Sequence, residues 1–144
     1  SLALAGLRPD KVTAVLVCVP AGADTNGNLH GRRAGYPFWP SENPEAMKTA
    51  LYFDTVNFAP RIKAPVFIVH GVGRVDAWRP GVVPITASSE FALALEKYHK
   101  VVKYKTYPNE TYYVYGHDNR RQLLLDMLEW FDLYLKDGAT SGVW

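Results

Sequence analysis

The sequence predicts an α/β protein built on a doubly wound, mainly parallel sheet. Residues 14–19 and 66–69 are continuous apolar runs without the polar alternation of a strand that has one solvated face. Such runs are typical of parallel strands with helices over both faces. Segments with helical periodicity separate the predicted strands, so strand and helix alternate along the chain. A helix between two buried parallel strands is the crossover of a right-handed βαβ unit.

The composition is that of an ordinary globular domain. The 144 residues suffice for one core, and 48% hydrophobic with 21% charged residues is a usual balance. The net charge of +2 comes from interspersed signs, so we expect neither a nucleic acid nor a membrane as partner. The single cysteine, Cys18, excludes an internal disulfide, and its apolar surroundings predict an inert core thiol.

The first predicted elements are a helix over residues 2–7 and a strand over residues 11–19, which Pro20 closes. The helix has an apolar body but none of the residues that usually begin a helix. We therefore expect the chain to be the C-terminal portion of a longer protein. The continuous apolar centre of the strand predicts an interior position in the sheet.

A lid-like segment over residues 21–62 separates the two buried strands. Its first part, residues 21–42, is irregular and contains four glycines and two prolines. A loop of this length in a compact domain is usually functional or a lid. The aromatic cluster of Tyr36, Phe38 and Trp39 either pins this loop onto the core or forms a wall that faces the substrate.

The second part of the lid-like segment carries clear helix signals. Asn43 supplies an N-cap, Pro44 fits the first helical position, and Glu45 places an acid in the first turn. Residues 53–62 predict a short second helix or turn that leads into the next strand. A later helix has an apolar face through Phe91, Leu95 and Tyr98, and Thr86 or Ser88 can cap it.

The last part of the chain predicts one more strand and a final helix. Residues 101–107 alternate better than the other two runs, which favours a strand nearer the sheet edge. A loop over residues 110–118 follows, and Asp118 or Asn119 can cap the final helix. The predicted buried stripe of that helix consists of Leu124, Met127, Leu128, Phe131 and Leu135.

Two candidate catalytic side chains follow the second and third predicted strands. Asp76 lies in the loop after the strand at residue 66, and His117 lies in the loop after the strand at residue 101. Both loops lie at the carboxyl edge of a parallel sheet, where open α/β sheets carry their chemistry. An acid that orients an imidazole, which then takes the proton of a nucleophile, is the acid–base half of a catalytic triad.

The sequence shows no pattern for a metal or a cofactor. The four histidines are scattered, and neither H-x-x-x-H, a Walker pattern nor G-x-G-x-x-G after a strand occurs. We expect His70, directly after a buried strand, to be a packed structural residue. His30 falls in the lid-like segment, and His99 is expected to be solvated. We therefore expect no cofactor and no metal.

Several stretches carry a family resemblance. Residues 52–66 (YFDTVNFAPRIKAPV) lead into the second strand, and residues 73–76 (GRVD) follow it with an acid. Residues 107–110 (YPNE) and the helix over residues 119–135 come after the third strand. Together with the helix over residues 1–5, these stretches resemble the C-terminal half of an α/β-hydrolase, most closely the acetyl xylan esterase and prolyl-oligopeptidase-type group.

This resemblance implies a serine hydrolase that works through an acyl-enzyme, with backbone N–H groups as the oxyanion hole. Asp76 falls at the family's catalytic acid. The nucleophile motif G-x-S-x-G is absent, which places the serine before Ser1, in a complementary N-terminal segment. The family histidine corresponds to Tyr112, five residues before His117. Either a reshaped loop lets His117 act as the base, or the histidine has been lost.

Two functions follow from this resemblance. The first is hydrolysis of carboxylic esters, acetyl esters among them, or of peptides. The second is binding of a ligand or partner by a non-catalytic homologue, which the tyrosine at the histidine position favours. Without its N-terminal complement the chain would expose a strand edge and an apolar face, so we expect it to be unstable alone. The expected substrate-binding residues are Tyr36, Phe38, Trp39, Trp78, Tyr112 and Tyr113.

Overall fold

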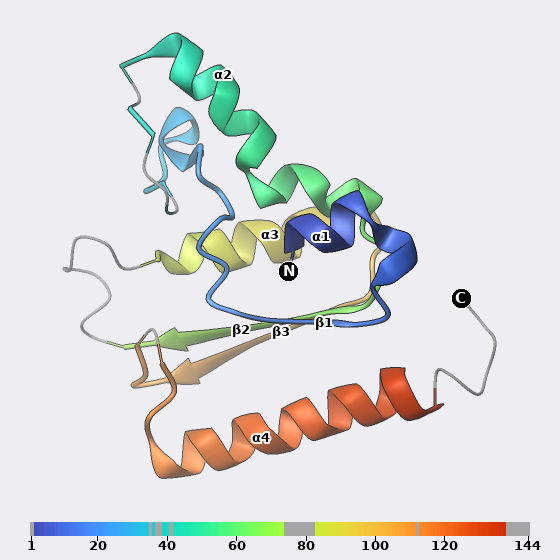
Figure 1. Cartoon of the computed structure of the whole chain (residues 1–144). Coiled ribbons are helices and arrows are strands. Elements are labelled where there is room, and N and C mark those ends of the chain that lie inside the picture. Colours follow the sequence, from blue (N-terminus) through green and yellow to red (C-terminus); the bar gives the residue numbers. More distant parts are fainter. Residues whose placement is uncertain are drawn as a thin grey trace.

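The computed structural model describes residues 2–34, 36, 39–40, 42–73, 83–111 and 113–137. It confirms the predicted α/β architecture, in which a parallel sheet lies between two layers of helices (Figure 1). The strand order is β1-β2-β3, so neighbours in the sheet follow one another along the chain. The strands are β1 (Val15–Cys18), β2 (Val66–Val72) and β3 (Val102–Pro108).

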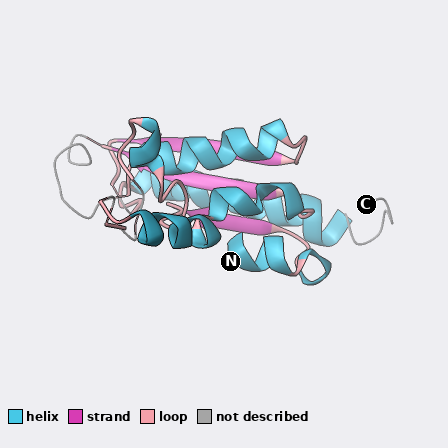
Figure 2. Cartoon of the chain, turned by 90° about the horizontal axis from the view of Figure 1, so that it is seen from above, coloured by secondary structure: helices cyan, strands magenta, loops and turns pink. Residues whose placement is uncertain are grey.

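Helices cover both faces of the sheet. Figure 1 shows α1 and α3 on one side and α4 alone on the other, and Figure 2 gives the view from above. Within the described residues, no helix combines the length and hydropathy needed to cross a membrane. The α-helices are α1 (Leu2–Leu7), α2 (Pro44–Phe53), α3 (Ile85–Lys97) and α4 (His117–Phe131). Shorter helical segments are η1 (Pro9–Lys11), η2 (Gly27–His30), η3 (Thr55–Arg61) and the π-helical η4 (Asp132–Asp137).

β2 is the central strand of the sheet. It pairs in parallel with β1, where Val66 lies opposite Val15, and with β3, where Val66 lies opposite Val102. Phe67 and Ile68 are fully buried, as expected from the apolar run. Because all strands are parallel, their carboxyl ends meet at one edge, and the loops after β2 and β3 begin there.

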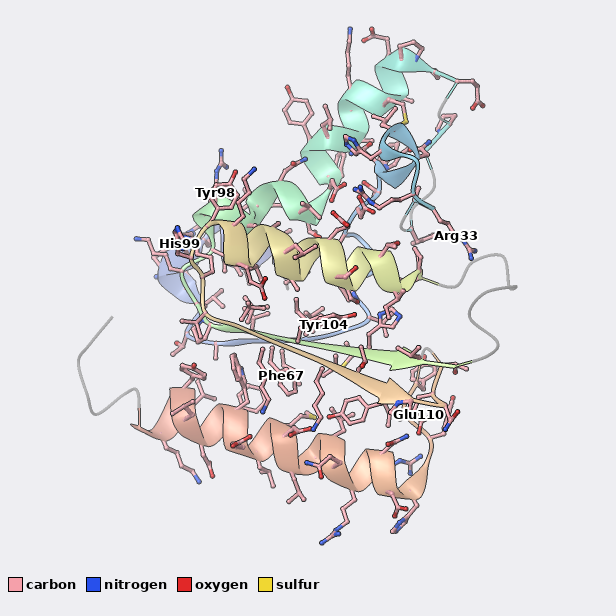
Figure 3. All side chains as sticks on the ribbon, turned by 180° about the vertical axis from the view of Figure 1, so that it is seen from behind. Arg33, Phe67, Tyr98, His99, Tyr104 and Glu110 are labelled. Carbon is pink, nitrogen blue, oxygen red and sulfur yellow. The ribbon has the colours of Figure 1, made fainter. Side chains whose placement is uncertain are left out.

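The two faces of β2 contact separate cores. Val66 and Ile68 pack toward α3, where Phe91 and Leu95 are fully buried. Phe67 packs toward α4, and its ring centroid lies 5.5 Å from that of Trp130. Figure 3 shows the labelled Phe67 and Tyr104 on opposite faces of the sheet. The alternation along one strand therefore joins both helical layers.

The helix signals of the sequence were partly correct. The Asn43 side chain accepts hydrogen bonds from the backbone N–H groups of Glu45 and Ala46, which confirms the predicted cap of α2. In contrast, α3 begins directly after Pro84, so the prediction of Thr86 or Ser88 as its cap was wrong. The predicted face of α3 is buried through Phe91 and Leu95, whereas Tyr98 is 44% exposed.

The predicted start and buried stripe of α4 were largely wrong. The helix begins at His117 after Gly116, before either predicted cap. Its buried side chains are Asp126 and Trp130, which are one turn apart and fix a different face toward the sheet. Met127 and Phe131 of the predicted stripe are half-buried. The remaining members of that stripe are exposed, namely Leu124, Leu128 and Leu135.

The prediction that residues 11–19 form an interior strand was also wrong for this chain. β1 lies at the edge of the sheet and pairs, within the described residues, with β2 alone. Cys18, expected as a core thiol, is exposed. The apolar run correctly predicted a buried face, since Val15 of β1 and Val19 directly after it belong to the core on the α3 side.

A buried carboxylate fixes α4 on the sheet. Asp126 accepts a hydrogen bond from Tyr107 Oη at 2.6 Å and one from Lys105 Nζ, both on β3. Burial raises the pKa of Asp126, but these hydrogen bonds outweigh it and hold the pKa below its ordinary value. Burial, together with Asp126, raises the pKa of Tyr107. The charge of Asp126 therefore sets the rotation of α4 that brings Trp130 onto Phe67.

Asp126→Asn removes this charge and keeps the size of the side chain. We expect the variant to lose about 2–3 kcal/mol in free energy of unfolding at pH 7, because hydrogen bonds to charged groups contribute that much. The folded pKa is lowered, so the stabilisation is complete above about pH 4 and is lost as the pH falls through the folded pKa. Urea unfolding followed by tryptophan fluorescence measures both effects.

Glu129→Gln is the matched control. Glu129 lies on the same helix and accepts a hydrogen bond from Lys103, but the carboxylate is exposed. We expect a change of about 0.5 kcal/mol or less. Equal losses in the two variants would contradict the role assigned to Asp126.

Candidate functional site

The loops after β2 and β3 touch at the carboxyl edge of the sheet. A Cβ atom added to Gly71 would overlap the carbonyl oxygen of Thr111, and one added to Gly73 would lie 2.5 Å from that of Glu110. Only glycine permits such a close approach of two backbones. The end of β2 therefore lies directly against the start of the loop that joins β3 to α4.

Glu110 ties this loop to the start of α4. Its carboxylate accepts hydrogen bonds from the backbone N–H groups of Tyr115 at 2.7 Å and Gly116 at 2.9 Å. The side-chain amide of Asn119 donates a third at 2.7 Å. The Asn119 hydrogen bond is the main cause that lowers the pKa of Glu110, and the two backbone N–H groups add to it. Glu110 is therefore a buried, ionised group at the candidate site.

Of the two predicted catalytic residues, the structure describes His117 but not Asp76. Asp76 lies outside the described residues, as do Trp78, Phe38 and Tyr112. His117 is the first residue of α4, and its side chain is 92% exposed. Its Nδ1 atom lies 3.2 Å from the carboxylate of Asp118.

Two cavities open near this edge. One, of about 350 Å³, is lined by Arg33, His70, Gly73 and Ile85 among others. His70 is buried, and its Nδ1 lies 2.7 Å from the Ser88 hydroxyl, which confirms that it is a packed residue. Figure 3 shows Arg33 and Glu110 toward the same end of the molecule, with Tyr98 and the exposed His99 at the other.

The second cavity, of about 310 Å³, lies on the α4 side of the sheet. Tyr113, Tyr115, Arg120 and Cys18 are among the residues that line it. The rings of Tyr113 and Tyr115 are 5.7 Å apart, and both side chains are exposed in part. Tyr113, a predicted binding residue, therefore lines a cavity.

Trp39 and Tyr36, the two described aromatic residues of the predicted cluster in the lid-like segment, have different surroundings. Trp39 stacks on Phe53 at the end of α2 with centroids 5.8 Å apart, so it joins the loop to the helix that follows. Tyr36 is 56% exposed. The Trp39 contact is with the lid's own helix, where Phe53 is 60% exposed, and neither described core cluster includes Trp39.

Buried carboxylates that sequence reasoning missed hold the lid-like segment in place. Asp54 accepts hydrogen bonds from the backbone N–H groups of Asp24 and Val56, both at 3.0 Å. The Asp24 carboxylate in turn forms two hydrogen bonds with Arg32, at 2.8 and 3.0 Å. An acid at the N-cap of a helix is a local signal for Asp54. Partners 30 residues apart leave no such local signal.

A metal centre is not assembled by the described part of the chain. Within it, no group of three or more His, Cys, Asp or Glu side chains is placed to hold an ion.

Gly71→Ala tests the contact between the two loops. We expect the added methyl group to lower the free energy of unfolding by about 1–3 kcal/mol, because the overlapping atom belongs to backbone. Amide exchange at Tyr115 and Gly116 should accelerate as the loop is displaced. Gly22→Ala is the control, since its Cβ would lie 3.6 Å from Thr55, an ordinary contact. Equal effects of the two variants would count against the close approach.

No family model matches the chain. It is 47% identical over 75 residues to the acetyl esterase Axe7A of Xylanibacter ruminicola, a stretch that covers 49% of this chain and 17% of the esterase. A puromycin-hydrolyzing peptidase of Mycobacterium tuberculosis superposes with a TM-score of 0.66 at 17% identity, over 93% of this chain and 20% of the peptidase. The acetyl xylan esterase of Paenibacillus sp. R4 superposes with a TM-score of 0.56 at 20% identity, over 93% of this chain and 41% of the esterase.

The chain thus spans 17% of the esterase and at most 41% of these two solved structures. The likeness in structure extends over nearly all of the chain, whereas the likeness in sequence to the esterase covers 49% of it. The chain has the fold of an α/β-hydrolase and resembles the acetyl xylan esterase and prolyl-oligopeptidase-type group.

Proposed function

We propose that the chain is the C-terminal portion of a serine hydrolase domain that cleaves carboxylic esters through an acyl-enzyme. The contact of Gly71 and Gly73 with Glu110 and Thr111 is the observation that carries this proposal. It brings the end of β2, after which Asp76 follows in the sequence, beside the start of the loop that leads to His117. The similarity to an acetyl esterase supports esters, acetyl esters first, over peptides.

The proposed mechanism divides the triad between two segments. The serine comes from the complementary N-terminal segment, whose strand would pair with the open edge of β1. Asp76 accepts a hydrogen bond from the imidazole of His117 and stabilises its charged form. His117 takes the serine proton as the oxygen attacks the ester carbonyl, and then gives this proton to the leaving alcohol. Water repeats the sequence on the acyl-enzyme and releases the acid.

The binding surface combines both cavities with the lid. The cavity of about 350 Å³ beside Gly73 has room for a small acyl group. Tyr36, Phe38, Trp39, Trp78, Tyr112 and Tyr113 are the proposed substrate-binding residues. Aromatic side chains suit the apolar faces of acyl groups and sugars.

A second candidate function is ligand or partner binding by a non-catalytic homologue. Two observations favour it. The family's histidine position is occupied by Tyr112, and the pKa of a tyrosine is ordinarily about 10, too high for a base at neutral pH. His117 is solvent-exposed and lies beside Asp118.

Labelling of the complete protein with a fluorophosphonate, and turnover of p-nitrophenyl acetate, separate the two functions. If the proposed function holds, the probe labels one serine, and His117→Gln or Asp76→Asn lowers kcat by about 10³–10⁴-fold. Tyr112→Phe, which keeps the ring and removes the hydroxyl, should change kcat by only a few-fold. Absence of labelling in a folded sample would rule out the hydrolase. Unchanged turnover in His117→Gln would remove His117 from the mechanism.

A further inference from the structure

We propose that Glu110 is a positioning residue, which fixes the loop between β3 and α4 against the end of β2. The role in turnover rests on the proposed function. The geometric part, a carboxylate that orders this loop, stands on the described contacts alone.

The first argument is the way that hydrogen bonds converge on this carboxylate. Oε2 accepts from the backbone N–H of Tyr115, and Oε1 accepts from Gly116 and from the Asn119 side chain. Glu110 itself is 4% exposed. The Glu110 side chain, at the start of the loop, thus binds the backbone of Tyr115 and Gly116 at the end of the loop.

The second argument is that the backbone packed around Glu110 leaves no room for this residue to move. Gly71 of β2 and Gly73, directly after β2, lie against it, and a Cβ added to Gly116 would lie 2.5 Å from Oε1. Asn119 also donates to the carbonyl oxygen of Pro108, the last residue of β3. Glu110 therefore joins the end of β2, the end of β3 and the first turn of α4 at one point.

The third argument concerns charge. Three N–H groups donate to the two oxygens, so the ionised carboxylate, which only accepts, suits these donors better than the protonated acid, which carries a donor of its own. Among the described residues, Arg120 of α4 is the charged group that acts on Glu110, and β2 contributes only glycines here. The pKa of Glu110 is lowered, so the ordered loop persists above the ordinary glutamate range and is lost as the pH falls through the lower folded pKa.

Glu110→Gln tests the inference in the complete protein. A glutamine has one acceptor oxygen, so it cannot accept from both Tyr115 and Gly116 without turning its NH₂ group toward an N–H donor. We expect amide exchange at Tyr115 or Gly116 to accelerate at least tenfold. For p-nitrophenyl acetate, kcat per fluorophosphonate-titrated site should fall about tenfold to a hundredfold, with KM changed less than threefold.

Two further variants keep the test decisive. Glu129→Gln removes an exposed carboxylate from α4 and should match the parent in both readouts. If Glu110→Gln does not fold, Asn119→Ala removes one of the three donors and should give a smaller change in the same direction. Parent-like exchange and parent-like kcat in Glu110→Gln would overturn the inference. If the parent protein shows no turnover, the proposed function fails, and the exchange rates alone decide the role of Glu110.

Discussion

β2 is the strand on which the rest of the structure depends, because it is paired on both sides and buried on both faces. Its side chains alternate between the core under α3 and the core over α4, so one strand joins both helical layers. Parallel pairing with β1 and β3 brings the carboxyl ends of the strands to one edge. Each side chain over residues 66–69 faces one of these two cores, which explains why this part of β2 is apolar throughout.

The end of β2 differs in sequence from the apolar run before it. After Val69 the chain continues with a buried histidine and then two glycines whose missing side chains admit the backbone of Glu110 and Thr111. Glu110 converts this contact into an ordered loop by accepting hydrogen bonds from the residues before α4. Asp126 acts likewise further along α4, where it fixes the rotation of the helix on β3. Two ionised, buried carboxylates therefore set the position of the last helix and of the loop before it.

The sequence predicted those features that local pattern controls. Apolar runs identified the parallel strands, Asn43 with Pro44 identified the start of α2, and the position of His70 identified a packed histidine. It predicted that the chain alone would expose a strand edge but not that β1 is this edge, because an apolar run records burial of faces and not the number of pairing partners. The buried face of α4 was missed because Asp126 counts as polar in any hydrophobic pattern, although Lys105 and Tyr107 satisfy its charge. Glu110 leaves no local signal of its role in the sequence, because that role depends on glycines about 40 residues earlier.

The central claim is that the loops after β2 and β3 meet to form the acid–base half of a triad. A crystal structure of the complete protein with a fluorophosphonate adduct measures this directly, through the distance from the Asp76 carboxylate to the nearest ring nitrogen of His117. The account predicts a hydrogen bond of about 2.6–3.2 Å. It would be contradicted if Tyr112 occupied that place beside Asp76 and His117 remained in solvent.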